Sequence, residues 1–257
     1  MIVSNSVVDG AEGTSPRSGT PNGDKPLPAV QHLLVRYAKR GKMRFASHRD
    51  VARAFERGVR RAGLPIAHSA GFTPHPKISY AGGAPTGVAS EAEYLSLALT
   101  SRNDAAAVRE RLNVALPDGI DVIDVAEDAG GLPASRLTAS EWQVVLPGLS
   151  LDSVGPAVRR FLALEHAPVE RLTNKGMRRM DARSAVVTID VRGNVGDYGG
   201  TDDDAALRIV MRHTVPAVRP DDVLTALHEI SGVTPTAPPL MTRLAQGSLG
   251  ESGVVDP

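Results

Sequence analysis

The clearest sign of a binding function in this sequence is a set of arginines at helical spacing. Within residues 47–62, four of them recur at positions i, i+4, i+8 and i+11, namely Arg49, Arg53, Arg57 and Arg60. On an α-helix this spacing places the four guanidinium groups along one stripe. A guanidinium can bind two phosphate oxygens at once. The stripe, with Arg61 beside it and Arg44 just before it, therefore predicts a binding site for a nucleic-acid backbone.

Two alternatives to a nucleic-acid site stay open for this stripe. Residues 31–80 hold eleven Lys and Arg against two Asp and Glu, whereas residues 81–130 hold three against nine. The arginines could pair with acids of the second segment, such as Glu91, Glu93 or Asp121, or they could form a solvated face. Like charges four residues apart on a helix repel by a few tenths of a kcal/mol per pair, so the stripe needs either partners or a ligand.

A loop rich in glycine and proline follows the basic segment. Pro74 and Pro76 flank His75 and stiffen it, and Phe72 and Lys77 lie close by in sequence. A rigid loop that presents an aromatic ring, an imidazole and an ammonium group suits RNA, whose unpaired bases stack on aromatic side chains. The alternative is a turn-rich connection with a packed phenylalanine and an incidental histidine.

A second basic cluster lies between residues 171 and 183. Its candidate nucleic-acid contacts are Lys175, Arg178, Arg179 and Arg183. The glycine and the mixed polarity of the segment favour a β-hairpin or an exposed loop.

Histidines are the candidates for catalysis. His48 and His75 could serve as general acid or base, because imidazole titrates near neutral pH. Neither belongs to a compact pattern of metal ligands, and the chain contains no cysteine. We therefore expect no metal and no cofactor held by this chain.

Composition limits the remaining classes of function. The absence of cysteine excludes disulfides and thiolate-bound iron–sulfur clusters on this chain. The basic and acidic residues balance, so binding of nucleic acid must come from local charge. No apolar run approaches the roughly 20 residues that span a bilayer, and we see no signal peptide. We expect a cytoplasmic protein with no membrane contact.

The elements that would position these residues follow an α+β pattern. Ser47 and Asp50 form a variant of the capping box at the start of the basic helix, and Gly63 with Pro65 ends it. Alternating and helical periods then predict β-α-β-β-α-β, the ferredoxin-like or split βαβ plan, followed by a looser repeat of it. The predicted fold is two ferredoxin-like domains in tandem, over residues 29–130 and 131–245, with disordered tails at 1–28 and 246–257.

Several motifs resemble one known family. They are FASHRD at residues 45–50, RAFER at 53–57, RRAGLP at 60–65, SAGFTPHPKI at 69–78 and GVASEAEY at 87–94. These stretches are similar to the radical SAM-associated (radical SAM-linked) protein family, a domain of unknown function, most densely over residues 32–100. The resemblance implies a domain that occurs beside, or fused to, a radical SAM protein. It implies that the radical chemistry lies on another polypeptide, because this chain lacks the three cysteines that such chemistry needs.

The leading hypothesis is therefore an accessory subunit that binds tRNA or another structured RNA and works with a separately encoded radical SAM enzyme. One alternative is a metal-independent RNA-processing enzyme that uses His75 or His48 as general acid or base. A second is a protein-binding scaffold whose basic helix meets an acidic partner.

Overall fold

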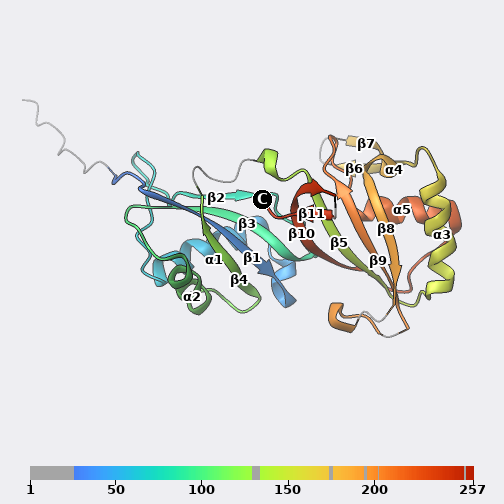
Figure 1. Ribbon diagram of the computed structural model, residues 1–257, viewed down its shortest axis with the longest axis horizontal. Coiled ribbons are helices and arrows are strands. Elements are labelled where there is room, and N and C mark those ends of the chain that lie inside the picture. The colour runs from blue at the N-terminus through green and yellow to red at the C-terminus, as the bar shows by residue number, and fades with distance from the viewer. Residues whose placement is uncertain (1–25, 129–133, 174–175, 194–195, 202, 252) are drawn as a thin grey trace, which may run out of the picture.

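The protein is a mixed α+β structure, as the sequence predicts, and its two halves lie along one long axis (Figure 1). The computed structural model describes residues 26–128, 134–173, 176–193, 196–201, 203–251 and 253–257. The predicted linker at 129–133 and most of the predicted N-terminal tail, residues 1–25, lie outside the described residues.

The first half is an antiparallel sheet with two helices. Its elements are β1 (Gln31–Lys39), the 3-10 helix η1 (Gly41–Phe45), α1 (His48–Arg61), β2 (Ile78–Ala81), β3 (Ala89–Leu99), α2 (Ala105–Ala115) and β4 (Ile120–Glu127). The strands lie in the order β4-β1-β3-β2 with antiparallel neighbours. This arrangement is compatible with the predicted split βαβ plan.

Local signals set the limits of α1. The hydroxyl of Ser47 accepts a hydrogen bond from the backbone N–H of Asp50, and the Asp50 carboxylate accepts one in return from the backbone of Ser47. Gly63 follows the helix with a positive φ of 60°, which favours glycine. The capping box and the glycine stop predicted from sequence are thus both confirmed.

The second half has the same strand order with an insertion. Its elements are η2 (Ala134–Arg136), β5 (Ala139–Leu146), α3 (Leu151–Ala163), β6 (Pro168–Thr173), β7 (Gly176–Asp181), α4 (Ala182–Ala185), β8 (Val186–Arg192), η3 (Gly196–Tyr198), β9 (Ala205–Arg212), α5 (Pro220–Ser231), β10 (Leu240–Gly250) and β11 (Gly253–Val255). Its main strands lie in the order β10-β5-β9-β8. The insertion is the two-stranded β6–β7 hairpin with α4, so of the two predictions for the second basic cluster, a β-hairpin or an exposed loop, the structure shows the hairpin, with Arg183 following it in α4.

Strand β10 joins the two halves into one sheet of nine strands. It pairs antiparallel with β5 along most of its length and parallel with β3 at two positions, Thr242 with Ala89 and Arg243 with Ser90. Each half keeps a hydrophobic core of its own, one around Phe55 and one around Phe161. The halves are therefore separate in their cores but continuous in their backbone hydrogen bonding.

The prediction of a disordered tail from residue 246 was wrong. Gln246 is fully buried within β10, and β11 pairs back onto β10. A Cβ at Gly247 would lie 1.8 Å from the carbonyl oxygen of Val255. The glycines that suggested disorder instead allow β11 to approach β10 closely.

Candidate nucleic-acid interface

Helix α1 turns its arginine stripe away from the core. Its apolar face is buried, and Phe55 meets Tyr37 of β1 edge to face, with ring centroids 4.7 Å apart. The side chains of the stripe arginines are all exposed, and none of these side chains makes an ion pair or a hydrogen bond with another described residue: Arg49, Arg53, Arg57 and Arg60. The stripe is thus a row of accessible positive charges without internal partners.

The acids that could have neutralised this stripe are engaged elsewhere. Glu91 and Asp121 both form ion pairs with Arg40, and Glu93 pairs with the buried Arg243. The interpretation of the stripe as one side of an internal ion-pair network was therefore wrong for the described part of the chain. The physical reason is that Arg40, which lies between β1 and η1, forms ion pairs with both Glu91 and Asp121.

Asp50 is the acid closest to the stripe in sequence, and it serves the helix start. Hydrogen bonds from the hydroxyl and the backbone N–H of Ser47, with a smaller contribution from the nearby arginines, lower the pKa of this carboxyl. Asp50 therefore stays ionised and caps the helix. Its single negative charge does not balance the four positive charges of the stripe.

Two hydrogen bonds between Ser69 and His75 close the loop that follows α1. The backbone N–H of Ser69 donates to the carbonyl of His75 over 2.9 Å, and the N–H of His75 donates to the hydroxyl of Ser69 over 3.0 Å. Phe72 is fully exposed at the tip, and His75 and Lys77 are exposed beside it. The alternative of a packed phenylalanine was wrong, because no described residue covers the ring.

His48 lies apart from this tip. Its ring is exposed and meets Tyr80 of β2 edge to face, at a centroid distance of 5.3 Å. The side chains of His48 and His75 make no hydrogen bond within the described segments that would orient either imidazole for proton transfer. Within the same segments, no three His, Asp or Glu side chains gather as metal ligands would.

Three of the predicted basic contacts have structural tasks. Arg44 donates to the carbonyl of Gly87, Arg61 to that of Ala115, and Arg183 to those of Leu162 and Val186. Each therefore has only part of its guanidinium free for a ligand.

The second basic cluster forms a separate patch. Arg178 and Arg179 are exposed on β7, and Lys175 lies outside the described residues. The β6–β7 hairpin belongs to the far half, well away from α1 along the long axis (Figure 1). These patches therefore do not line one groove.

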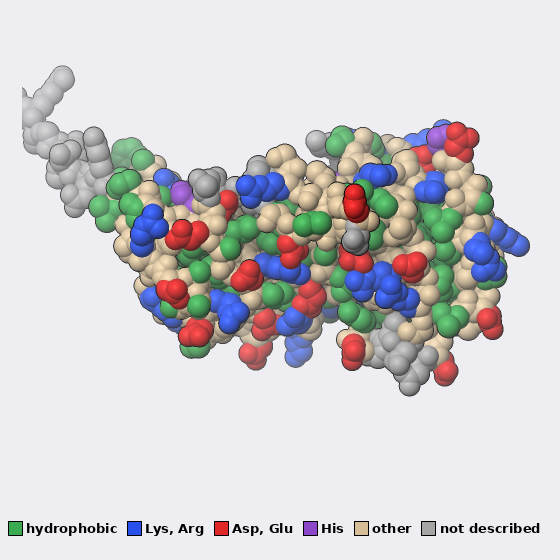
Figure 2. All heavy atoms as spheres, in the orientation of Figure 1, with side chains coloured by type: hydrophobic (Ala, Val, Ile, Leu, Met, Phe, Trp, Pro, Cys, Tyr) green, Lys and Arg blue, Asp and Glu red, His purple; other side chains and the backbone are tan. Residues whose placement is uncertain are grey.

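The face of the molecule drawn in Figure 2 contrasts with the stripe, because its basic and acidic side chains are interleaved. Ion pairs neutralise several charges on the strands, for example Arg208 of β9 with Glu141 of β5 and Arg36 of β1 with Asp256. A surface that neutralises itself in this way offers phosphates little net attraction, unlike the arginine stripe of α1.

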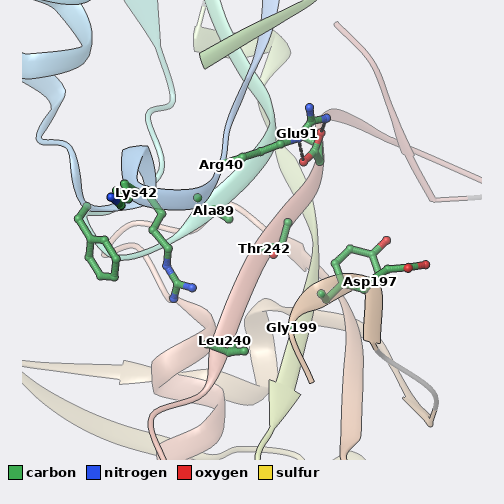
Figure 3. A pocket seen from close by; sticks show the side chains of 12 residues that line it. Arg40, Lys42, Ala89, Glu91, Asp197, Gly199, Leu240 and Thr242 are labelled. Carbon is green, nitrogen blue, oxygen red and sulfur yellow. Dashed lines mark hydrogen bonds and ion pairs between the residues drawn. The ribbon is translucent and has the colours of Figure 1, made fainter. Parts of the chain in front are cut away.

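The structure also shows sites that sequence reasoning missed. A cleft of about 580 Å³ lies where η1 and β3 of the first half face η3 and β10 of the second. Figure 3 shows Lys42 at the left of the cleft, the Arg40–Glu91 pair at its top, and Asp197 with Gly199 at its right. Its walls come from segments about 150 residues apart, which no local motif connects.

A buried charge cluster was missed as well. Lys39, Glu93 and Arg243 are all nearly inaccessible to solvent. Glu93 accepts hydrogen bonds from Arg243 and from the backbone N–H of Ala84, and Lys39 donates to the carbonyls of Ala84 and Pro85. Burial, partly offset by Glu93, lowers the pKa of Lys39.

These features define the class: an α+β protein in which one nine-stranded sheet joins two cores and one helix carries unpaired arginines. A family model described as "Uncharacterized protein conserved in bacteria (DUF2344)" matches residues 32–220. The chain belongs to this family. Within the described segments, no helix has both the length and the apolar character needed to cross a bilayer.

Other comparisons give only distant likenesses. No curated protein matches the chain. A chain of the crystal structure of a Cbf5-Nop10-Gar1 complex is 11% identical, with a TM-score of 0.45 over 90% of this chain and 56% of that chain. A DypB variant in complex with manganese is 12% identical, with a TM-score of 0.22 over 79% of this chain and 85% of that chain. The chain thus spans little more than half the length of the first of these structures. Neither likeness assigns a function.

Proposed function

We propose that this protein binds RNA through α1 and the adjoining loop. The observation that carries the proposal is the row of four exposed arginines on one helix face, without an internal partner among the described residues. Such a row is repulsive in the free protein, and phosphates relieve the repulsion while releasing condensed counterions. The geometry therefore favours a polyanion as the ligand.

The loop supports RNA as that polyanion. A fully exposed Phe72 on a stiff loop offers a platform for one unpaired base, and Lys77 beside it offers a phosphate contact. Proteins that recognise RNA commonly combine basic side chains with such stacking surfaces. A structured RNA with an accessible single-stranded loop, such as a tRNA, fits both features.

The proposed role is that of an accessory subunit of a separate radical SAM enzyme. Its support is the sequence resemblance over residues 32–100, together with the lack of any cysteine in this chain. In this role α1 and its loop hold the RNA while the partner supplies the chemistry. Co-expression of the full chain with radical SAM proteins of its own genome, followed by pull-down, tests the partnership; repeated recovery of unrelated proteins alone would refute it.

RNA binding is tested by the double variant Arg53→Gln, Arg57→Gln. The control removes two exposed arginines of α3 that make no contact with an acid among the described residues, Arg159→Gln with Arg160→Gln. We expect the α1 variant to bind tRNA about tenfold more weakly or worse, with a salt dependence flatter by about one unit for each phosphate that is no longer neutralised. Its unfolding free energy should stay level or rise by a few tenths of a kcal/mol.

Filter binding at several salt concentrations, beside thermal melting, measures both quantities. Wild-type protein without RNA affinity at low salt would refute the proposal. An equal loss of affinity in the α3 control would refute the assignment to α1, because it would show a response to total charge alone.

A further inference from the structure

A second pocket lies beside the buried charge cluster, where the two halves meet. Its volume is about 330 Å³. Its floor is lined by Met241, Arg243 and Gln246 of β10, whereas the cleft of Figure 3 is lined by Leu240 and Thr242 of the same strand. Successive side chains of a strand point to opposite faces, so Met241 and Arg243 face the pocket while Leu240 and Thr242 face the cleft on the other side of the sheet. An irregularity in the pairing of β10 with β5 between Arg243 and Ala245 interrupts the alternation and brings Gln246 to the same side as Arg243.

One side chain of the floor has an unused donor. Gln246 is fully buried, and its Oε1 accepts a hydrogen bond from Arg243. Its Nε2 has no hydrogen-bond partner among the described residues. An unmet buried donor costs about 1–3 kcal/mol. The Nε2 atom has almost no solvent-accessible surface and lies against Gly82 at the border of the pocket.

The chain makes room for this amide. Gly82 has a φ of 60°, and a Cβ there would lie 2.3 Å from Nε2 of Gln246. A glycine at this turn therefore leaves the space that the Gln246 amide occupies beside the pocket.

The pocket is also rich in positive charge. In its floor Arg243 is 4% exposed, and with Lys39 it faces the single carboxylate of Glu93. At the rim, Arg212 and Arg219 are exposed, and their side chains make no ion pair within the described segments. Asp221 is the one acid among the described residues that line the pocket. Cations exceed carboxylates both in the floor and at the rim, which favours an anionic ligand.

The remaining wall is apolar. Val88 and Met211 line it, next to Met241 of the floor, with Trp142, whose indole N–H already donates to the hydroxyl of Ser140. The pocket thus offers donors and positive charge on one side and an apolar surface on the other. Its volume falls in the range of small-molecule sites.

We propose that this pocket binds a phosphate monoester that carries a flat or apolar group, with a nucleoside monophosphate as the fitting example. The phosphate meets Arg212 and Arg219 at the rim, above the buried Arg243 and Gln246 of the floor, and the base lies against the apolar wall. The same chemistry can come from a free nucleotide or from the 5′-phosphate of an RNA. This site is distinct from α1 and goes beyond the proposed function.

Calorimetric titration of the full chain with UMP, uridine and inorganic phosphate tests the proposal. We expect UMP to bind at least about tenfold more tightly than uridine, a factor that corresponds to about 1.4 kcal/mol. Arg212→Gln and Arg219→Gln should each weaken UMP binding by about tenfold, whereas Arg159→Gln should not change it. Equal binding of UMP and uridine, no binding of UMP at millimolar concentration, or indifference to both rim variants would overturn the proposal.

Gln246→Glu is a second, isosteric test. It keeps the acceptor for Arg243 but replaces the free donor with a negative charge, so the fold should persist while UMP binding is lost. A folded Gln246→Glu protein with wild-type affinity for UMP would count against the site.

Competition identifies the source of the phosphate. Displacement of UMP by 5′-phosphorylated pentauridylate, but not by its 5′-hydroxyl form, would indicate an RNA end, and binding of UMP alone would indicate a free nucleotide. The variant Arg53→Gln, Arg57→Gln should bind UMP normally, so failure of the α1 proposal and failure of this one are separable.

Discussion

Replacement of Glu93 by glutamine should destabilise the protein far more than its small change in shape suggests. Glu93 is the carboxylate that faces two buried cations, Lys39 and Arg243. Glutamine keeps the size and one acceptor but removes the charge. Two positive charges then remain inside the protein without a counter-charge.

The magnitude follows from that burial. Removal of one partner from a buried ion pair costs about 3–5 kcal/mol. We expect about 3 kcal/mol for Glu93→Gln, because the glutamine carbonyl still accepts a hydrogen bond. Stabilities of native domains are about 5–15 kcal/mol, so the variant should fold with a clearly lower denaturant midpoint.

The deficit should shrink as the pH rises. The pKa of Lys39 is already lowered in the folded protein by burial, whereas in the unfolded chain it is about 10.4. Between these two values the unfolded chain binds more protons, so stability rises with pH. Glu93 raises the pKa of Lys39, so its loss lowers that pKa further in the folded protein. The pH range over which stability rises with pH then extends to lower pH. Protonated Lys39 therefore accounts for the part of the deficit that shrinks with pH, and Arg243, which stays charged, accounts for the rest.

Urea unfolding of wild type, Glu93→Gln and Glu91→Gln at neutral pH and at pH 9 measures these effects. Glu91 lies two residues away on the same strand and pairs with Arg40, with side-chain exposures of 27% and 48%. Such a pair contributes about 0.2–1 kcal/mol. If Glu93→Gln were as stable as Glu91→Gln, or if its deficit grew with pH, the reasoning about the buried cluster would be refuted.

Three further outcomes are expected. Phe72→Ala should leave the melting temperature unchanged and weaken RNA binding by about 1–3 kcal/mol, measured by filter binding, because the exposed ring offers only stacking; unchanged affinity would remove Phe72 from the interface. Gly148→Ala should destabilise by about 1–3 kcal/mol in urea melts, since Gly148 has a φ of 75° and a Cβ would lie 2.4 Å from Oγ1 of Thr236; wild-type stability would contradict the strain. Hydrogen bonds from the backbone N–H groups of Thr201 and Gly148 lower the pKa of Asp204 in the folded protein. The contribution of Asp204 to folding stability is therefore complete above its pKa in the unfolded chain, about 3.9, and is lost as the pH falls through its pKa in the folded protein. Asp204→Asn should therefore flatten the decline of stability below pH 4, seen in melts from pH 3 to pH 6, and an unaltered decline would show that Asp204 does not contribute.

Sequence alone predicted those elements whose signals are local. Helix α1 begins and ends within one residue of its predicted limits, because Ser47, Asp50 and Gly63 act on neighbouring backbone groups. The exposure of its arginines followed from the same periodicity. The periodicity could not show whether the arginines have acidic partners, because Glu91 and Asp121 pair with Arg40, which lies 51 and 81 positions away from them in the sequence.

Strand β10 marks the limit of such reasoning. Its glycines and serine resemble a disordered tail in composition, and its place is decided by β3 and β5, which are remote in sequence. The pocket residues were missed for a related reason. A lone Gln246 carries no motif, and it gains its role from Arg243 and from the space left at Gly82.

The central position of β10 also has a consequence for the order in which the protein can assemble during its synthesis. Residues 240–250 emerge from the ribosome after the other long strands, yet they fill the middle of the finished sheet. Until they arrive, β5 presents an open edge of unpaired backbone groups, and such edges recruit other chains. Aggregation of nascent or truncated protein should therefore begin at β5, which lies inside the sheet of the complete fold, rather than at β4 and β8, which are the outer strands of that sheet.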